Sequence, residues 1–349
     1  MQKKEISFAR IFLLLFVLSL VSTALAGCAV SPYPYELEEY IIVPENWNEM
    51  SIQESEIAVR VNDMIQQARE NAAIREIVIS RASEEGDLVD ISFVCYKAAE
   101  YGKGGAMIDV LSDAGCSLKI GEGKYPHELE EELKGRYAGD SFVVRMTLPD
   151  SYTVGYAGET MIYEVSVNNV TALRLPLYND AFVRSISECE NVEEYEAILY
   201  ERAKEDIAWE NVFRASETKL YPEQELNSHR SDYVTYYTNL AAEADVSLEA
   251  YVGRKFFISL ADFHREAEIY ARETVKKELL LYYFQRKYDL EVSDSEYTEM
   301  AKKYANENGL ISVSELEEKF GKEYVRKTVQ YDKVLAYIAE TVTIAEDIV

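Results

Sequence analysis

Short runs of alternating apolar and polar residues mark the chain between Gly86 and Thr171. The runs Val89–Phe93, Phe142–Met146 and Tyr163–Val167 have the two-residue period that is typical of half-buried strands. Gly-Asp, Gly-Glu-Gly and Leu-Pro-Asp segments stand between the runs and predict turns. This region is therefore predicted to form a small antiparallel sheet.

The rest of the chain has the apolar spacing of helices. A helix is predicted over Ser51–Ala72, followed by a short strand over Ile74–Ile79, and the pattern is helical from Pro176 onward. The clearest helix is Asp262–Leu290, where an apolar residue recurs at every fourth position. Three capping boxes predict helix starts: Ser51-x-x-Glu54, Ser293-x-x-Glu296 and Ser312-x-x-Glu315. The predicted fold class is α+β.

Composition narrows the classes of function. The chain has 349 residues and a formal net charge of -27, and 48% of its residues are hydrophobic. This length allows two or three domains with substantial cores. So acidic a surface repels phosphate backbones, and no nucleic-acid partner is expected. The 27 tyrosines supply apolar area with a polar tip. We expect most of them in the core and a minority in contact with partners.

The first 27 residues have the pattern of an export signal. Lys3, Lys4 and Arg10 precede the apolar run Ile11–Leu25. Leu-Ala-Gly-Cys then matches the bacterial lipobox, in which the cysteine thiol, here Cys28, receives a diacylglycerol. The predicted protein is thus extracytoplasmic and lipid-anchored to the bacterial cell membrane, with residues 29–39 as a tether. The alternative is an ordinary secretory signal with an incidental cysteine.

The other cysteines and the histidines give no pattern of a metal or redox site. Cys95, Cys116 and Cys189 are odd in number, so they cannot form a complete disulfide framework. A bridge between Cys95 and Cys116 is one interpretation, and buried unpaired thiols are the other. HExxH, CxxC and GxSxG motifs are absent, and the three histidines lie far apart in the sequence. No cofactor and no metal are expected.

The order of segments from Leu118 to Tyr163 resembles the FKBP-type peptidyl-prolyl isomerase domain, most closely that of trigger factor chaperones. Leu175–Phe182 resembles the link that leaves this domain in that family, and Tyr221–Leu226 resembles the entry to an arm helix. Ala267–Ile338 follows the helix order of the trigger factor C-terminal domain. The resemblance implies an FKBP-like antiparallel sheet wrapped on a short helix, followed by an all-α arm domain. It implies these segments: a lipoprotein signal peptide (1–27), a tether, strand and linker helix (28–84), an isomerase-like domain (85–175) and a helical chaperone domain (176–349).

The resemblance also implies a reaction, the rotation of X-Pro bonds. The barrier to this rotation, ~18–20 kcal/mol, reflects the double-bond character of the amide. An apolar pocket with a few fixed hydrogen-bond donors favours the twisted amide, so no general acid or nucleophile is required. The family's pocket positions match five residues of this chain: Phe93, Tyr125, Leu129, Tyr152 and Tyr163.

Two departures from the family pattern affect turnover. Pro126 stands where the family uses a backbone N–H to bind the substrate carbonyl, and proline has no N–H. Lys103 stands where the family has an acid, although Tyr101 could restore the neighbouring aromatic after a shift of one residue. We therefore expect a peptidyl-prolyl isomerase by resemblance whose turnover is weak or absent but whose peptide binding is retained.

Three functions follow for comparison. The first is a membrane-anchored folding factor of the trigger factor type, acting on unfolded or nascent exported proteins with X-Pro bonds. The second is a non-catalytic holdase with a degenerate isomerase pocket. The third, a solute-binding lipoprotein, requires two α/β lobes and is disfavoured by the long helical half. Trigger factors begin with a ribosome-docking domain carrying a Gly-Phe-Arg-x-x-x-x-Pro loop, and no segment here matches it, so no ribosome is expected as a partner.

Overall fold

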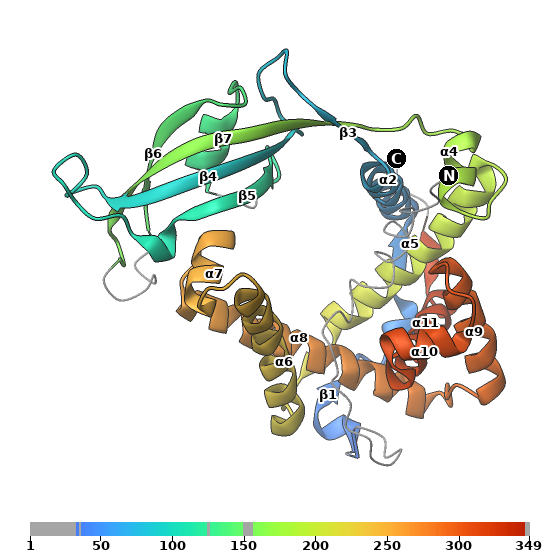
Figure 1. Cartoon of the computed structure of the whole chain (residues 1–349). Helices are drawn as coiled ribbons and strands as arrows, with labels where there is room; N and C mark the ends of the chain where they lie inside the picture. Colours follow the sequence, from blue (N-terminus) through green and yellow to red (C-terminus); the bar gives the residue numbers. More distant parts are fainter. Residues whose placement is uncertain (1–32, 35, 124–125, 149–155, 346–349) are drawn as a thin grey trace. The chain divides into compact units, whose positions relative to one another are not determined.

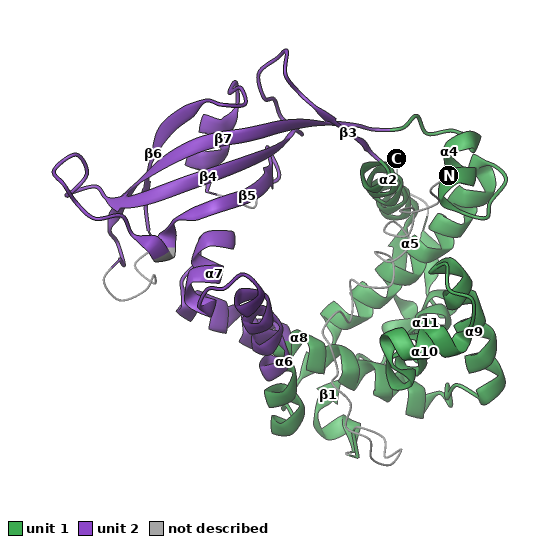
Figure 2. Ribbon diagram, viewed as in Figure 1, with its two compact units in different colours: residues 1–72, 176–229, 271–349 green, residues 73–175, 230–270 purple. Residues whose placement is uncertain are grey.

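The computed structural model describes residues 33–34, 36–123, 126–148 and 156–345. Their contacts divide the chain into two compact units, drawn in two colours in Figure 2. The first unit takes residues 1–72, 176–229 and 271–349, and the second takes residues 73–175 and 230–270. The sequence placed residues 230–270 with the helical domain, whereas their contacts group them with the sheet.

The second unit is built on one antiparallel sheet (Figure 1). Its strands run in the order β3-β7-β4-β5, and β6 also pairs with β7. The long strand β7 is the centre of the sheet, because it pairs with β4, β6 and β3. The strands are β3 (Ile74–Ile77), β4 (Leu88–Lys97), β5 (Asp113–Lys119), β6 (Ser141–Thr147) and β7 (Thr160–Arg174). The predicted antiparallel sheet is confirmed.

Alternation along the strands places one face of the sheet in a core. In β6 every second residue is buried, and in β4 the buried positions include Val89, Ile91 and Phe93. Helix α3 (His127–Leu133) contacts β6 and adds the fully buried Leu129 and Leu133 to the same apolar cluster. Burying a leucine side chain contributes about 1.5–3 kcal/mol, so this helix is a substantial part of the sheet's core.

The tip of the helical half belongs to the same unit as the sheet. It comprises the end of α6 (Glu223–Glu243), the short helix α7 (Leu248–Lys255) and the start of α8 (Leu260–Lys287). Helix α7 contacts the 3-10 helix Asp109–Leu111, which precedes β5. The hydroxyl of Ser247 accepts a hydrogen bond from the backbone N–H of Ala250 and begins α7.

The first unit is mostly helical. Its main cluster of buried side chains joins the N-terminal segment to α2, α5, α8 and α11, with Trp47 against the ring of Phe284. A smaller cluster joins α9, α10 and α11. The helices are α2 (Glu54–Asn71), α4 (Asp180–Ile186), α5 (Val192–Ala215), α9 (Asp294–Glu307), α10 (Val313–Phe320) and α11 (Lys322–Thr341).

Two short strand pairs close this unit. β1 (Ile41–Ile42) pairs antiparallel with β8 (Glu217–Thr218). β2 (Ser51–Gln53) pairs parallel with β9 (Thr343–Ala345). Each pair joins segments far apart in the sequence, so the N-terminal residues are tied to the helical body at two places.

Several local predictions need correction. The helix predicted from Ser51 begins at Glu54, because residues 51–53 form β2, and its capping box uses Gln53 and Glu56. The capping box at Ser293 is confirmed. Ser312 caps α10 as expected, but the Glu315 carboxylate accepts from the N–H of Ile311 instead.

The predicted tether is shorter than expected. Tyr33 is 1% exposed and Leu37 is 3% exposed, and both belong to the main helical core. Pro- and Glu-rich composition predicted a free segment, but two large apolar side chains in it are enough to anchor it. Among the described residues, no helix is long and apolar enough to cross a membrane. The predicted signal segment and Cys28 lie outside the described residues.

A candidate peptide-binding site

Three of the five predicted pocket residues lie in one buried cluster of the sheet unit: Phe93 on β4, Tyr163 on β7 and Leu129 on α3. Phe93 lies opposite Val165 in the register of β4 and β7, so Tyr163 is its diagonal neighbour on the same face. The two ring centroids are 5.7 Å apart in an edge-to-face arrangement. Tyr125 and Tyr152 lie outside the described residues.

A free thiol lies beneath this aromatic pair. Cys95 is opposite Tyr163 in the strand register and is fully buried. Burial raises the pKa of Cys95 to about 12, and a hydrogen bond with Tyr163 opposes this effect. Cys116 lies opposite Ile91, which is four positions from Cys95 along β4, and the two cysteines do not form a disulfide. Of the two interpretations, the structure supports buried thiols, and burial makes Cys95 an unreactive part of the sheet's core.

Pro126 lies directly before α3. Its φ of −52° and ψ of 130° make it the residue that precedes the first helical turn. Its carbonyl oxygen accepts hydrogen bonds from the N–H groups of Leu129 (2.9 Å) and Glu130 (3.1 Å). The proline therefore starts the helix well but offers no N–H to a substrate carbonyl.

The other departure lies away from the aromatic pair. The Lys103 ammonium donates to the carbonyl of Ala99 at 3.0 Å in an exposed turn. Tyr101 donates its hydroxyl to the Glu164 carboxylate at 2.8 Å, and this hydrogen bond raises the pKa of Tyr101. Glu164 is exposed and adjacent to Tyr163, so it points to the opposite face of β7. Tyr101 thus does not restore the missing pocket aromatic, and that alternative is wrong.

A residue that the sequence did not single out completes the cluster. Phe257, just after α7, packs against the buried core of the sheet. Its ring centroid is 5.7 Å from that of Phe93 and 6.3 Å from that of Tyr163. No local pattern marks it, because the contact joins two parts of the chain that are distant in sequence. The aromatic pair is therefore in contact with residues 230–270, the helical segment of the same unit, called the arm below.

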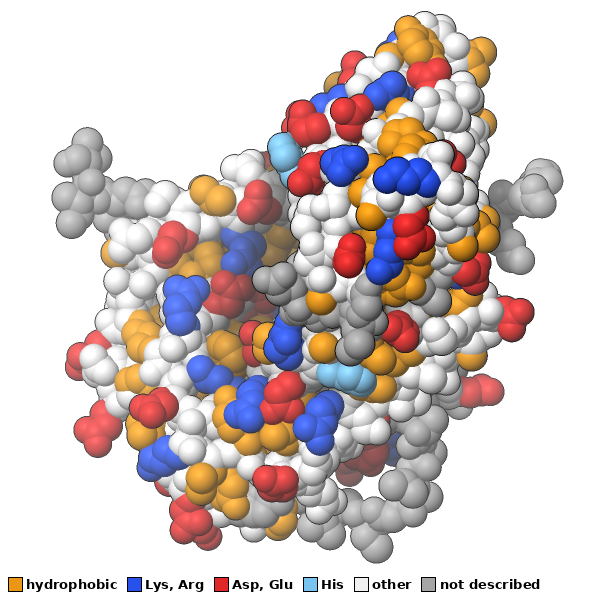
Figure 3. Space-filling view, turned by 90° about the vertical axis from the view of Figure 1, so that its left-hand side faces the viewer, with side chains coloured by type: hydrophobic (Ala, Val, Ile, Leu, Met, Phe, Trp, Pro, Cys, Tyr) orange, Lys and Arg blue, Asp and Glu red, His pale blue; other side chains and the backbone are white. Residues whose placement is uncertain are grey.

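The arm itself carries a second aromatic group on α6 and α8. The ring of Tyr233 lies 5.0 Å from Tyr237, 5.4 Å from Phe263 and 5.0 Å from Tyr270. Phe263 is fully buried, whereas Tyr236 on the same part of α6 is 39% exposed. On the face drawn in Figure 3, apolar side chains lie exposed among acidic and basic ones. An exposed ring such as that of Tyr236 can contact an unfolded chain through its apolar face.

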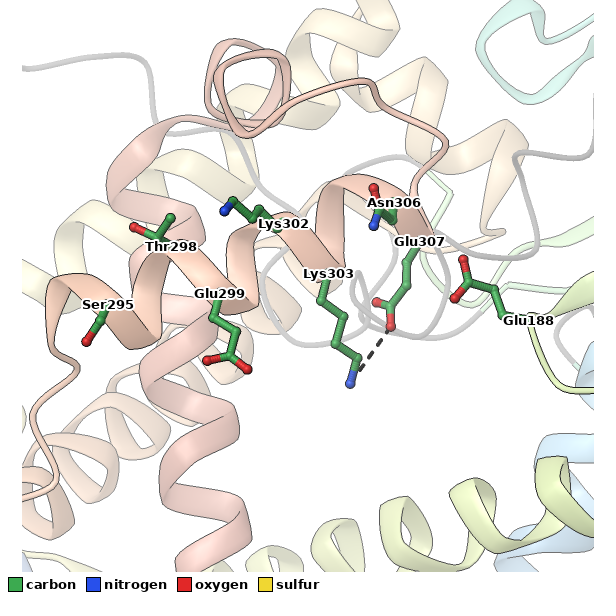
Figure 4. Close-up of a pocket in the computed structure, with 8 residues that line it drawn as sticks. All are labelled: Glu188, Ser295, Thr298, Glu299, Lys302, Lys303, Asn306 and Glu307. Carbon is green, nitrogen blue, oxygen red and sulfur yellow. Dashed lines mark ion pairs between the residues drawn. The ribbon is translucent and has the colours of Figure 1, made fainter.

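The first unit contains a polar hollow of about 670 Å³ beside α9 (Figure 4). Its lining is hydrophilic, and Lys303 forms an ion pair with Glu307 at 4.0 Å. It belongs to a different unit from the cluster around Phe93, and open charged hollows of this kind differ from the enclosed apolar sites that small ligands prefer. The lining residues are Glu188, Ser295, Thr298, Glu299, Lys302, Lys303, Asn306 and Glu307.

In the described part of the chain, many ionisable groups pair with one another. Within the described ranges, no group of three His, Cys, Asp or Glu side chains is placed to hold a metal ion. His229, for example, bonds the buried carboxylate of Glu278 at 2.8 Å. The side chains packed around Phe93 are apolar and aromatic, so this part of the sheet unit suits apolar contact and not acid–base or metal chemistry.

Comparison with known proteins agrees with the resemblance. No protein-family model matches the chain. The trigger factor of Acetivibrio thermocellus is 25% identical over 337 residues, covering 91% of this chain and 75% of that protein. The trigger factor of Alkaliphilus oremlandii is 24% identical over 292 residues, covering 78% of this chain and 64% of that protein. The chain thus spans about two thirds to three quarters of these relatives.

Among solved structures, a trigger factor chaperone is 19% identical and covers 86% of this chain, with a TM-score of 0.34, which is too low to support an argument about the fold. The sequence similarity is the stronger finding, because it extends over most of the chain in several relatives. The trigger factor of Finegoldia magna, for instance, is 23% identical over 326 residues and covers 88% of this chain. The chain is therefore similar to trigger factors along most of its length, and this similarity supports a function in protein folding.

Proposed function

We propose that this protein is a folding factor of the trigger factor type that holds unfolded segments of exported polypeptides and turns over X-Pro bonds slowly or not at all. One observation carries the proposal. The aromatic pair Phe93 and Tyr163 lies in a buried cluster, and Pro126, which has no N–H, directly precedes α3, where the resemblance implies a donor. Removing one donor from an electrostatically stabilised site costs about 10²–10³ in rate. Binding through apolar contact needs no such donor.

The arm supplies a second contact for clients. Tyr236 on α6 and Ile269 on α8 are 39% and 56% exposed. Exposed apolar side chains of this kind release ordered water when an unfolded chain covers them, at roughly 25 cal/mol per Å² of apolar area. The acidic surface around them does not oppose this contact, because it acts on charge and not on apolar area.

The place of action is part of the proposal. If Cys28 carries a diacylglycerol, it lies five residues before the buried Tyr33. A fully extended chain spans about 3.3–3.6 Å per residue, so the folded body would stay within roughly 18 Å of its anchor. Clients would then be held close to the outer surface of the membrane as they emerge. Replacing Cys28 with alanine should move the protein from the membrane fraction to the soluble fraction, and unchanged fractionation would refute the anchor.

Suppression of aggregation tests the holding function. The full chain should reduce light scattering from an unfolding client at near-equimolar concentration. The double variant Tyr236→Ser, Ile269→Ser should reduce it less. A matched control, Ile311→Ser, changes a side chain that is 95% exposed in the other unit. Loss of protection in the control but not in the arm variant would contradict the role of the arm.

An active isomerase is the second candidate. The retained Phe93, Leu129 and Tyr163 favour it, since amide rotation needs no acid, metal or nucleophile. A prolyl-peptide assay on the full chain separates the two candidates. We expect a rate at least about 10² below that of a standard FKBP domain. A comparable rate would establish the second candidate and overturn the first.

A further inference from the structure

Helix α5 places one guanidinium among three carboxylates where it packs on α11. The charged group of Arg202 lies 3.6 Å from that of Glu205 and 3.5 Å from that of Asp206, both on α5. It lies 3.4 Å from the carboxylate of Asp332 on α11. The four side chains are 21% to 26% exposed. The negative charge in this half-buried cluster therefore exceeds the positive charge.

Two of the three carboxylates are surplus to the pairing. Asp332 accepts a hydrogen bond from the Tyr304 hydroxyl at 2.5 Å and one from the Arg202 guanidinium at 3.4 Å. In the described structure, neither Glu205 nor Asp206 accepts a hydrogen bond from that guanidinium, so charge attraction alone holds them beside it. Two like charges close to each other in a partly dehydrated place disfavour the ionised form of both.

The helices packed against α5 do not offset this excess. On α2, the Arg60 guanidinium donates to both oxygens of the Glu210 carboxylate, at 3.0 Å and 2.9 Å, so its charge is already paired. On α5 itself, Lys204 pairs with Glu201 at 3.7 Å. The other ionisable groups that act on the cluster or on its partners are acids and phenols: Asp63 on α2, Tyr304 and Glu307 on α9, and Tyr331 on α11.

Burial raises the pKa of Glu205 above its ordinary value of 4.5 and the pKa of Asp206 above its ordinary value of 3.8. The attraction of Arg202 opposes this effect without cancelling it. A group whose pKa is raised in the folded chain binds its proton more tightly there than in the unfolded chain. Its protonation therefore stabilises the fold. This stabilisation is complete below the ordinary pKa and is lost as the pH rises through the raised one.

We propose that Arg202, Glu205 and Asp206 form an acid-strengthened clamp, which tightens the packing of α5 on α2 and α11 when the medium becomes mildly acidic. A proton taken up by either surplus carboxylate removes their mutual repulsion and leaves Arg202 paired with Asp332. The clamp goes beyond the proposed function, because it concerns only how firmly the helical unit is packed. A folding factor outside the cytoplasm would meet changes of pH directly.

Asp206→Asn tests the sign of the effect, because an amide is neutral at every pH, as the protonated carboxyl is. Native-state hydrogen exchange of the α5 amides in the full chain measures how often this junction opens. At neutral pH the protection factors should be higher in the variant than in the wild type. This gain should disappear as the pH falls toward 3.8, the ordinary pKa of aspartate. Its change with pH is limited to about tenfold per pH unit, because one proton is involved.

A stabilising ion pair predicts the opposite sign. If the charge of Asp206 strengthened the junction through Arg202, the variant would be less protected at neutral pH, and the difference would shrink in acid. That result would overturn the clamp, and so would a ratio of protection factors that is the same at both pH values. Comparing variant and wild type at one pH removes the effect of pH on the exchange chemistry itself.

Two controls make the comparison specific. Asp63→Asn makes the same change at an exposed position of α2 and should follow the wild type at each pH. Glu205→Gln should behave like Asp206→Asn, because it neutralises the other surplus carboxylate. Carbon-13 NMR of the carboxyl groups in the wild type needs no variant to fold. Titration midpoints above 3.8 for Asp206 and above 4.5 for Glu205 support the clamp, and midpoints at or below these values contradict it.

Discussion

Tyr33→Phe tests how firmly the N-terminal segment is held to the helical unit. The Tyr33 hydroxyl donates to the Glu278 carboxylate at 2.5 Å, and the Tyr33 side chain is 1% exposed. Glu278 also bonds His229 at 2.8 Å and forms an ion pair with Lys327. The carboxylate therefore keeps two partners when the hydroxyl is removed, and the phenylalanine ring keeps its packing.

The expected cost is that of one hydrogen bond to a charged group, about 1.5–3 kcal/mol. This corresponds to a change of roughly 10- to 150-fold in the equilibrium between the docked and detached segment. We expect a cost near 3 kcal/mol, the upper end of this range, because the Glu278 side chain is 7% exposed and little water can replace the lost donor. Were the segment a free tether, the same substitution would cost nothing.

Native-state hydrogen exchange measures how often the N-terminal segment detaches, one backbone N–H at a time. The N–H of Tyr40 bonds the carbonyl of Leu37, so its protection reports detachment of this segment. In Tyr33→Phe, the protection factor of the Tyr40 N–H should fall by roughly 10- to 150-fold. The control is Tyr282→Phe, a neighbouring ring with its centroid 5.2 Å from that of Tyr33. Equal protection in the two variants would refute the role assigned to the buried carboxylate.

Three further predictions concern the sheet and α9. Pro126→Ala restores an N–H before α3, at a φ of −52° that alanine adopts freely. If the missing donor is what limits turnover, the isomerisation rate of a prolyl peptide should rise by up to about 10²–10³. An unchanged rate contradicts this prediction. Asp87 has a side chain that is 5% exposed and pairs with Arg81 at 2.6 Å, so Asp87→Ala should lower the free energy of unfolding by about 1–3 kcal/mol in urea titrations, and a loss below about 0.5 kcal/mol would be inconsistent with the pairing. The hydrogen bond from Lys333 lowers the pKa of Glu296 to about 2 from its ordinary value of 4.5, so the stabilisation from Glu296 is present above pH 4.5 and is lost as the pH falls to about 2. The difference in Tm between the wild type and Glu296→Gln should shrink over that range, and a constant difference would show that the charge is not involved.

The sequence was most informative where one physical effect decides the local structure. Alternation identified β4, β6 and β7, because each has one face in the core. The stripe along residues 267–283 identified α8, and Ser293 identified the start of α9. These patterns depend only on residues close together in the sequence, so the sequence alone is enough to predict these elements.

The sequence was least informative where distant segments meet. Residues 51–53 satisfied a helical start equally well, but pairing with Thr343–Ala345 makes them a strand. Tyr33 lies in the predicted tether, but its hydroxyl donates a hydrogen bond to the distant Glu278 carboxylate. Phe257 was one aromatic among many in a helical half, and only the structure places it against Phe93. Three of the predicted residues, Phe93, Leu129 and Tyr163, thus lie in one cluster, whereas the packing of Phe257 against it was not predictable from the sequence.

The refolding of a client whose slow phase is prolyl isomerisation, in the presence of the full chain, tests the central claim most directly. Uncatalysed isomerisation takes about 10–100 s, so it is easily separated from aggregation in one experiment. The account predicts a higher yield of native client with the slow-phase rate constant unchanged, because the chain holds unfolded segments but lacks the donor at Pro126. A slow phase accelerated by orders of magnitude, or a yield no better than in buffer, would contradict it.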